Sequence, residues 1–589
     1  MPTAHSLKLG PSGLLAIAAA SAPSLLAYNV SPSPTFLNQA LAVGLWGGFV
    51  VATAHTARQT AATPGGAGPL MAALALMLLA VGWSWGPGGL PASLALSALA
   101  MLGGAMVLVA GGAAQRSAAP VFALFCAGWV VAGVFNVGIA GVQVFAPDWP
   151  DGDWIARSGI VGRAVGNLRQ PNHLSSLLLW SAIAVVALLE LRWLGWRWAL
   201  ALSAALLFAV VLTASRTGLV SVGLLALWGL VDRRLSAPGR ALLIAAPLLY
   251  ALSWFGMAAW AEASAHTFGG AARLAETDVS GSRFGIWANT LDLIRQNPWL
   301  GVGFGEFNYA WTLTPFPGRP TALFDHAHNL PLQLAAELGL PLASAVMVLL
   351  LWALWRAAAT AWRAPGDSGV ARRAALMMVL MIGLHSLLEY PLWYAYFLLP
   401  AAWAWGFALG QPADIRRGQP ANIRRGQPAD VVLRPATALV LGGAALAVGS
   451  LLSVADYQRV AAIFSAPDGA PPLAQRIADG QRSLLFSHHA DYAAATAGDT
   501  SAQGLAPFDS ATHYLLDSRL MMAWARALQS AGRSEQARAV AQRLREFRNP
   551  LADEFFEDCA AASAPLAASA AFQCEPPARA PGWREFLPP

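Results

Sequence analysis

The stretch NLPLQLAAELGLPLASAVMVLLLWALW, residues 329–355, decides how this chain folds. Glu337 is its only charged residue, and leucine, alanine, valine and tryptophan make up most of the rest. A helix of about 20 apolar residues is long enough to cross the hydrocarbon core of a bilayer. We therefore predict a transmembrane helix here. Asp325, His326 and His328 stand directly before it, so polar side chains lie at the mouth of a membrane span.

Similar apolar runs recur along most of the chain. Of its 589 residues, 56% are hydrophobic and 12% are charged, whereas about 25% of the residues of a soluble domain are charged. We therefore predict an all-α polytopic membrane protein with about 12–13 transmembrane helices. The first run is interpreted as a retained helix, because no small-residue cleavage site and soluble domain follow it. The predicted spans are 12–29, 36–55, 69–85, 91–111, 120–142, 173–190, 193–213, 217–231, 241–260, 329–355, 374–388, 392–409 and 433–454.

The positions of the arginines predict an orientation in the membrane. With the N-terminus in the cytoplasm and the spans alternating, the arginine-rich loops all fall on the cytoplasmic side, as the positive-inside rule requires. The opposite side, the periplasm of a bacterium, receives the long loops 143–172 and 261–328 and the tail after about residue 455. Because no basic cluster is interleaved with aromatic residues, we predict no nucleic-acid partner despite the net charge of +6. The arginines of the cytoplasmic loops are Arg58, Arg116, Arg192, Arg197, Arg233, Arg234, Arg240, Arg356, Arg363, Arg372, Arg373, Arg416, Arg417, Arg424 and Arg425.

The same pattern divides the chain into five segments. The stretch GQPADIRRGQPANIRRGQPAD, residues 410–430, is a tandem octapeptide repeat with no apolar periodicity, which is typical of a flexible linker. We expect N-terminal membrane helices (1–150), a core with long periplasmic loops (151–410), a basic cytoplasmic linker (411–432), a last membrane helix (433–454) and a small helical periplasmic domain (455–589).

The C-terminal tail is polar and predicted to be helical. MMAWARALQSAGRSEQARAVAQRLREF, residues 521–547, spaces alanine and leucine at helical intervals around an AGR turn. This pattern predicts one helical hairpin of the tetratricopeptide type, with a simple capping domain as the alternative. Cys559 and Cys574 pair if the tail is extracytoplasmic, and two free thiols are the alternative. Cys126 lies in an apolar run and is predicted to be inert.

Polar motifs far apart in the sequence fall on the predicted periplasmic side. They are GRAVGNLRQPNH (162–173), SRTG (215–218), GSRFGIW (281–287), FDHAHN (324–329) and HSLLEYPLWY (385–394). Polar residues close to a bilayer cost free energy, so they mark functional sites more often than polar residues elsewhere. The candidate residues of the site are Arg169, Gln170, Asn172, His173, Arg216, Arg283, Asp325, His326, His328, Glu389 and Tyr390.

Each motif also has an ordinary structural interpretation. Gln170 to His173 can cap the helix that follows, and Asp325 can cap the helix after His328. Arg216 can be an interfacial arginine whose charged head reaches water. The glycine-rich stretch NPWLGVGFGEF, residues 297–307, can be a turn that docks a helix, and it lacks the GK[ST] ending of a nucleotide-binding loop.

The chemistry of these residue types favours a diphosphate group and a hydroxyl nucleophile. The planar guanidinium of arginine binds phosphate oxygens bidentately and keeps its charge, and a histidine can take a proton from a hydroxyl near neutral pH. His326 and His328 have no Cys-x-x-Cys or His-Glu-x-x-His beside them, so we predict no metal ion. No Gly-x-Ser-x-Gly motif is present to support a serine hydrolase. We expect glycosyl transfer from a polyprenyl-diphosphate donor, with arginines stabilising the leaving group and no cofactor.

At these residues the chain resembles the O-antigen ligase and polymerase superfamily, and among its members the bacterial protein O-oligosaccharyltransferases that glycosylate pilin. The ligase signature begins at His328-Asn329, continues through nine residues to Gly339, and closes three residues later with glycine, threonine or tyrosine. Leu342 occupies that last position here, which departs from the signature. The motifs GNLRQPNH, SRTG, GSRFGIW and EYPLWY follow the family's order, and the resemblance covers about residues 150–410.

The resemblance implies a fold, a reaction and roles for individual residues. It implies a GT-C-like fold in the bacterial inner membrane, with an active site facing the periplasm. Such an enzyme moves an oligosaccharide en bloc from undecaprenyl diphosphate, with inversion, to serine or threonine of a pilin-like acceptor protein. His328 is then the catalytic base, Arg216 and Arg283 bind the donor diphosphate with Arg169 in reserve, and Gln170 and Tyr390 match polar positions of the protein-modifying branch.

Two other functions fit the same sequence. Within the superfamily, the acceptor can be the lipid A core, as in O-antigen ligases, or a growing glycan, as in polymerases. A solute transporter with polar residues along its path is a function of a different class. Against a transporter, the polar motifs gather on one side of the membrane and no inverted repeat is evident.

Overall fold

The computed structural model describes residues 10–57, 66–115, 119–275, 283–410, 435–497, 504–561 and 571–587. These residues form helices joined by turns, and none of them belongs to a β-strand. This confirms the predicted all-α class. The predicted linker 411–432 lies outside the described residues, as do Arg58, Arg116 and the first two residues of GSRFGIW.

Every predicted span corresponds to an observed apolar helix. Within the described ranges, nine helices are long and apolar enough to cross a membrane. They are α2 (Phe36–Ala57), α3 (Gly68–Trp85), α4 (Ala92–Ala113), α5 (Ala119–Phe145), α6 (Pro171–Glu190), α9 (Ala237–Ser264), α13 (Leu330–Arg363), α14 (Gly366–Ser386) and α16 (Pro435–Phe464). Four shorter apolar helices complete the set: α1 (Pro11–Leu25), α7 (Trp196–Leu212), α8 (Arg216–Val231) and α15 (Ala395–Leu409). The protein is therefore a multi-pass membrane protein.

The chain divides into two compact units. Unit 1 holds residues 1–74, 103–276 and 349–452, and unit 2 holds 75–102, 277–348 and 453–589. The division falls inside α3, α4, α13 and α16, so each of these helices contributes residues to both units.

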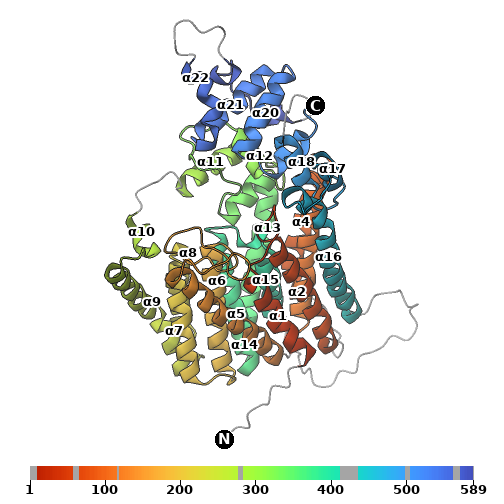
Figure 1. Cartoon of the computed structure of the whole chain (residues 1–589). Coiled ribbons are helices and arrows are strands. Elements are labelled where there is room, and N and C mark those ends of the chain that lie inside the picture. Colours follow the sequence, from red (N-terminus) through yellow and green to blue (C-terminus); the bar gives the residue numbers. More distant parts are fainter. Residues whose placement is uncertain are drawn as a thin grey trace, which may run out of the picture. The chain divides into compact units, whose positions relative to one another are not determined.

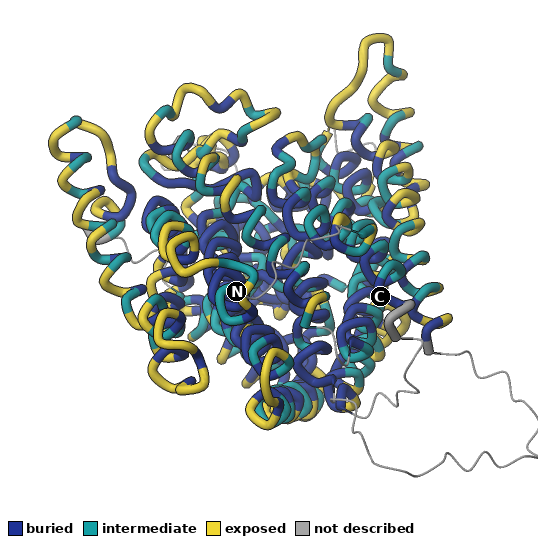
Figure 2. Tube along the Cα trace, turned by 90° about the horizontal axis from the view of Figure 1, so that it is seen from below, coloured by how far each residue is buried: buried dark blue, intermediate teal, exposed yellow. Residues whose placement is uncertain are grey.

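Unit 1 is a bundle centred on α6. This helix packs against α5, α7, α8 and α14, and Figure 1 shows α5, α6 and α7 running side by side. Almost every residue of α6 is buried, whereas α9 exposes the apolar side chains of Leu248, Leu252 and Phe255. Figure 2 shows such exposed positions on outer helix faces and in loops. Exposed apolar side chains on a long apolar helix are what contact with lipid requires.

One helix of unit 1 starts earlier than predicted. The sequence places Arg372 and Arg373 in a cytoplasmic loop before a span at 374–388, but both are buried inside α14, which begins at Gly366. The Arg373 Nε atom lies 2.6 Å from Asp232 Oδ2, and Arg372 Nη1 donates to the Phe407 carbonyl at 3.0 Å. Buried charges persist only when they are paired and hydrogen-bonded, and partners this distant in the sequence are not visible as a local pattern.

Unit 2 contains the tail and the loop that precedes α13. Its helices are α11 (Arg283–Gln296), α12 (Phe307–Leu313), α17 (Leu473–Gly480), α18 (Ser487–Thr496), α19 (Phe508–Tyr514), α20 (Ser518–Ser530), α21 (Ser534–Glu546) and α22 (Glu557–Ala561). The predicted hairpin is present, because α20 and α21 pack against each other on either side of a short turn (Figure 1). α12 is buried against the tail helices α19 and α21, in a core that includes Trp311 and Leu528.

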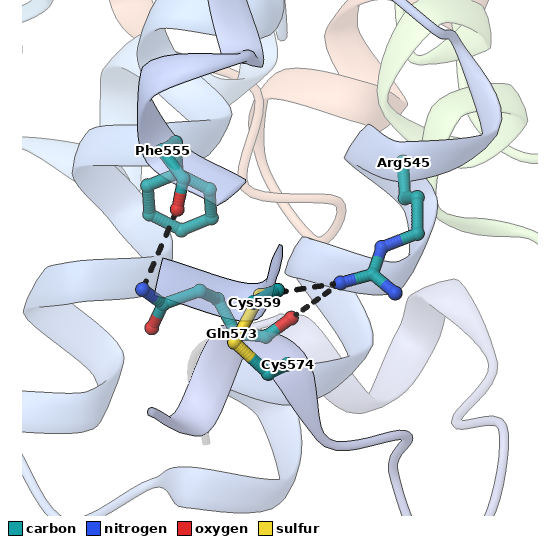
Figure 3. Close-up of a disulfide and its surroundings, with 5 residues drawn as sticks. All are labelled: Arg545, Phe555, Cys559, Gln573 and Cys574. Carbon is teal, nitrogen blue, oxygen red and sulfur yellow. Dashed lines mark hydrogen bonds between the residues drawn. A yellow bond between two sulfur atoms is a disulfide. The ribbon is translucent and has the colours of Figure 1, made fainter. Parts of the chain in front are cut away.

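A disulfide closes the end of the tail. Cys559 and Cys574, fifteen residues apart, are bonded, so of the two alternatives the paired one is observed. Arg545 donates to the carbonyl of Gln573 at 3.1 Å beside the bond, as Figure 3 shows. Cys126 is buried in α5 and not bonded, as predicted.

A break in α13 explains the glycine-rich stretch 297–307. Gly339 leaves the helical conformation with φ 73° and ψ 163°, and Pro341 has no N–H to donate. The carbonyls of Ala336 and Glu337, which the break frees, instead accept hydrogen bonds from Val302 at 2.9 Å and Gly303 at 3.0 Å. The stretch therefore docks on a helix, which was the structural interpretation of its sequence.

Candidate functional site

Three of the polar motifs share one local architecture. In each, a non-glycine residue with positive φ precedes a polar residue that caps the next helix, and the φ values are 57°, 49° and 53°. Such conformations cost about 1–3 kcal/mol and persist only where the surroundings hold them. Each cap accepts a hydrogen bond from a backbone N–H of the first helical turn. The pairs are Arg169–Gln170 before α6, Ala214–Ser215 before α8, and His328–Asn329 before α13.

In unit 1, Asn172 joins three motifs through hydrogen bonds. Its Nδ2 donates to Glu389 Oε1 at 2.8 Å, and its Oδ1 accepts from the Ser215 hydroxyl at 2.7 Å. Glu389 is buried, and Ser215 also caps α8 by accepting from Gly218. The starts of α6 and α8 and the EYPLWY segment are therefore connected at this amide.

A second group of polar side chains lies along α6. His173 Nδ1 is 3.1 Å from the Tyr396 hydroxyl, and Ser176 Oγ is 2.8 Å from His385 Nδ1. The two imidazole rings are buried, with centroids 5.9 Å apart. Tyr390 stacks on Tyr394, and the ring of Tyr394 in turn lies 4.5 Å from that of His173.

Three predicted residues of unit 1 make structural contacts, and the first of these is the helix cap that was the ordinary interpretation of its sequence. Gln170 accepts a hydrogen bond from the His173 N–H at 2.9 Å and so caps α6. Arg169 donates to the Ala27 carbonyl at 2.9 Å, which ties the loop before α6 to the end of α1. Arg216 begins α8 and donates to the Arg273 carbonyl at 3.2 Å.

In unit 2, neighbouring elements fix the backbone of the FDHAHN turn. The Ala327 N–H donates to Gln333 Oε1 at 2.7 Å, and the Ala327 carbonyl accepts from Trp287 Nε1 at 3.0 Å. Gln333 also donates to Glu337 Oε1 at 2.9 Å, so its amide has a fixed orientation. The turn is therefore held from α11 on one side and from α13 on the other.

The geometry of His328 defines its tautomer. Its Nδ1 lies 2.9 Å from the His326 carbonyl oxygen, which can only accept a hydrogen bond, so Nδ1 carries the proton in the neutral ring. The lone pair is then on Nε2. Burial and the positive charge of Arg283 lower the pKa of His328 to about 4. The imidazole is therefore neutral at pH 7, which is the form that can accept a proton.

The side chains of Asp325 and His326 contact each other next to this histidine. His326 Nδ1 is 3.2 Å from Asp325 Oδ1. Burial acts to raise the pKa of Asp325, but His326 and His328 outweigh it and lower that pKa below the ordinary value. The cap of α13 is Asn329, whose Oδ1 accepts from the Leu332 N–H at 3.1 Å, so Asp325 does not cap this helix as its position suggested.

The side chain of Asn308 links the tail to the FDHAHN turn through two hydrogen bonds. This link was not predicted from the sequence. Asn308 Nδ2 donates to the Phe324 carbonyl at 3.1 Å, and its Oδ1 accepts from the Leu516 N–H at 2.7 Å. Two residues before Asn308, Glu306 Oε2 lies 2.7 Å from His513 Nδ1. Asn308 and Gln333 carried no motif in the sequence, because their partners are distant or are backbone groups.

Within the described ranges, no group of three or more histidine, cysteine, aspartate or glutamate side chains is placed to hold a metal ion.

The predicted residues of the site fall into two groups, one in each unit. The group in unit 1 contains Arg169, Gln170, Asn172, His173, Arg216, Glu389 and Tyr390, and the group in unit 2 contains Arg283, Asp325, His326 and His328.

The fold and these groups define a multi-pass membrane protein with polar clusters at the starts of apolar helices. Its residues 199–347 match the family described as O-antigen ligase, and residues 164–189 match protein glycosylation ligase. Residues 373–554 match the family described as virulence factor membrane-bound polymerase, C-terminal. Over these residues the chain is similar to members of the O-antigen ligase superfamily, in line with the resemblance seen in the sequence.

Two curated proteins of Acinetobacter baylyi (strain ATCC 33305 / BD413 / ADP1) are similar to this chain. A general O-oligosaccharyltransferase is 27% identical over 266 residues, which are 43% of this chain and 44% of the relative. A ComP-specific O-oligosaccharyltransferase is 28% identical over 264 residues, which are 42% of this chain and 44% of the relative. The chain thus spans less than half the length of either relative.

Proposed function

We propose that this protein is a glycosyltransferase that moves an oligosaccharide en bloc from undecaprenyl diphosphate to serine or threonine of periplasmic proteins such as type IV pilin. The reaction inverts the anomeric carbon and needs no metal ion or other cofactor. The geometry of His328 is the observation that carries this proposal. The hydrogen bond at Nδ1 sets the tautomer of the neutral imidazole, so that the lone pair is on Nε2. A neutral imidazole of this kind is suited to act as a general base.

The reaction has one bond-forming and one bond-breaking event. The acceptor hydroxyl gives its proton to His328 Nε2, and its oxygen attacks C1 of the first sugar. The bond from C1 to the diphosphate oxygen breaks, and undecaprenyl diphosphate leaves with the negative charge. Attack opposite the leaving group inverts the configuration at C1.

Arginine side chains are proposed to stabilise the leaving diphosphate. Arg283 is supported by its position in unit 2, where its charge is close enough to lower the pKa of His328. Arg216 is assigned to the diphosphate through the family resemblance. Arg169 is the reserve candidate, and its guanidinium donates to the Ala27 carbonyl.

The remaining predicted residues are proposed to shape the acceptor and donor pocket. Asn172, Glu389 and Tyr390 belong to the connected helix starts of unit 1. Gln170 and His173 orient the first turn of α6. Asp325 and His326 adjust the charge beside the proposed base.

The inner membrane, with the site facing the periplasm, is the proposed location. The arginine-rich loops support this orientation. The Cys559–Cys574 disulfide also supports it, because disulfides persist in oxidising compartments such as the periplasm. In this proposal residues 1–150 are membrane helices, 151–410 the catalytic core, 411–432 a cytoplasmic linker, 433–454 the last span and 455–589 a periplasmic domain.

A polymerase is the second candidate, because residues 373–554 match the polymerase family. A polymerase or an O-antigen ligase would use the same donor and the same base but a different acceptor. The two curated relatives, whose names state O-oligosaccharyltransferase activity, favour a protein acceptor.

A transfer assay with purified components tests the proposal. Wild type and His328→Ala each receive undecaprenyl-diphosphate oligosaccharide and a purified pilin with a chelator present, and the intact mass of the pilin is measured. His266→Ala is the matched control, because exposed His266 also donates from Nδ1 to the carbonyl two residues earlier, at 2.9 Å, outside the predicted site. We expect a glycan-sized gain with wild type and the control only.

Other outcomes have distinct meanings. Transfer by His328→Ala at the wild-type rate would refute the proposed base. Extension of lipid-linked glycan or of lipid A core without modification of the pilin would identify a polymerase or an O-antigen ligase.

A further inference from the structure

Unit 2 contains a cavity that belongs to neither group of predicted residues. Its volume is about 210 Å³, and it lies between α12 and the tail helices α19 and α20. Aromatic rings form much of its wall, from Tyr309, Trp524 and Phe586. The centroids of Trp524 and Phe586 are 5.4 Å apart, and Tyr309 stacks on His513 at 4.8 Å.

Several polar groups of this wall are left available for a ligand. No residue in the described part of the chain donates a hydrogen bond to the carboxylate of Asp509, which is an exposed residue. Arg533 donates from Nε to Gln536, and its terminal nitrogens donate to none of the described residues. The hydroxyl of Tyr309 and the indole N–H of Trp524 likewise bond to no residue that the structure describes.

This combination restricts the chemistry of the ligand. A carboxylate and a guanidinium on the same wall disfavour a net charge of either sign and favour a neutral group that both donates and accepts hydrogen bonds. Aromatic faces favour a ligand with an apolar face. A sugar ring has both properties, since one face presents C–H groups and its edge presents hydroxyls. A peptide that binds by adding a strand to a sheet edge has no partner in the described part of unit 2, which contains no strand.

We infer that this cavity binds one saccharide unit of the glycan, at a site other than the predicted base. The inference rests on the proposed function, because that function supplies an oligosaccharide as the substrate. Trp524 and Phe586 would stack on the sugar face, while Asp509 and Arg533 bind its hydroxyls. Holding one sugar of the donor in this way would lower the donor KM and leave kcat largely unchanged, since the contact is equal in the ground and transition states.

Saturation-transfer NMR on the full chain in detergent tests the site directly. The probes are glucose, galactose, N-acetylglucosamine and N-acetylgalactosamine, with a serine-containing tripeptide as the comparison. Asp509→Asn keeps the shape and removes the charge, and Trp524→Phe removes the indole N–H but keeps an aromatic ring. The controls are Asp468→Asn, an exposed carboxylate on a tail loop away from the cavity, and His328→Ala.

At least one sugar should give a signal with wild type and with both controls. Asp509→Asn should weaken that binding about tenfold or more, and Trp524→Phe, which keeps a stacking ring and loses a neutral N–H, about two- to tenfold. Helical circular dichroism and elution volume confirm that each variant is folded. No sugar signal with wild type, an undiminished signal in Asp509→Asn, or binding of the tripeptide alone would each overturn the inference.

A parallel transfer assay separates this inference from the proposed function. Transfer that proceeds with an unchanged donor KM in Asp509→Asn refutes the saccharide site while the transferase stands. Sugar binding that depends on Asp509 in a protein that transfers no glycan supports the site and refutes the transferase.

Discussion

The break in α13 should require glycine at position 339. Replacing Gly339 by alanine tests this requirement. Its φ of 73° and ψ of 163° lie in a region that is essentially restricted to glycine. A Cβ atom here would lie 2.3 Å from the Trp299 carbonyl oxygen and 2.8 Å from the Gly301 nitrogen. These neighbours are backbone atoms, so the clash cannot be relieved by rotating a side chain.

The cost follows from the contacts that must separate. The backbone conformation itself costs about 1–3 kcal/mol for a non-glycine residue. Moving 298–303 away from 336–340 removes the bonds of Val302 and Gly303 and the 2.7 Å bond from the Leu340 N–H to the Pro298 carbonyl. Each contributes about 0.5–1.5 kcal/mol net. We expect Gly339→Ala to destabilise the protein by about 3–7 kcal/mol in total.

Heating followed by fluorescence-detected size exclusion measures this effect. At about 2–4 °C per kcal/mol, the midpoint should fall by about 6 °C or more. Transfer should fall at least about tenfold below the melting transition, because small displacements of a catalytic group are costly and α13 carries the Gln333 that holds the FDHAHN turn.

Glycines in open positions provide the matched control. A Cβ on Gly223 or Gly256 would meet no atom within 4 Å, and alanine is favoured over glycine inside a helix by up to about 1 kcal/mol. Gly223→Ala and Gly256→Ala should therefore leave the midpoint unchanged or raise it. If Gly339→Ala behaves like these two variants, the argument about the break is wrong.

Three further predictions concern the base, its support and the tail. Because the pKa of His328 is lowered to about 4, the neutral base persists as pH falls, and kcat/KM for the donor should decline only below about pH 5; a limb near the ordinary histidine value in a pH–rate profile would contradict this. Gln333→Leu removes the bonds to Ala327 and Glu337, so transfer should fall about tenfold or more at unchanged yield; normal activity would deny Gln333 a positioning role. Replacing both Cys559 and Cys574 by serine removes a cross-link over fifteen residues, which costs about 3 kcal/mol; proteolysis of the tail should accelerate while transfer persists, and loss of transfer would show that the tail's end is needed for activity.

The sequence predicted the helices because an apolar run long enough to cross a bilayer is a local property. It placed the start of α14 wrongly because Arg372 and Arg373 look like loop residues until Asp232 and the Phe407 carbonyl are beside them. It also did not predict the break in α13, although the sequence GLP at 339–341 combines glycine with a proline that lacks an N–H.

Some features of the candidate site could be predicted from the sequence and others could not. The polar motifs stood out because charged and amide side chains are expensive next to apolar spans. The tautomer of His328 was not predictable, since it depends on a carbonyl two residues away in a left-handed turn. The role of Asn308 was not predictable either, since its backbone partner Leu516 is 208 residues distant.

These contacts bear on whether the tail is only a cap. The FDHAHN turn is held by Trp287 of α11, by Gln333 of α13 and, through the Phe324 carbonyl, by Asn308 of α12. The Oδ1 atom of the same amide accepts a hydrogen bond from the Leu516 N–H of the tail. The orientation of this amide therefore depends on the tail. A covering domain would need only apolar contacts with what it covers. The hydrogen bonds through Asn308 instead make the tail one of the elements that position the turn carrying His328, and we expect loss of the tail to displace that turn.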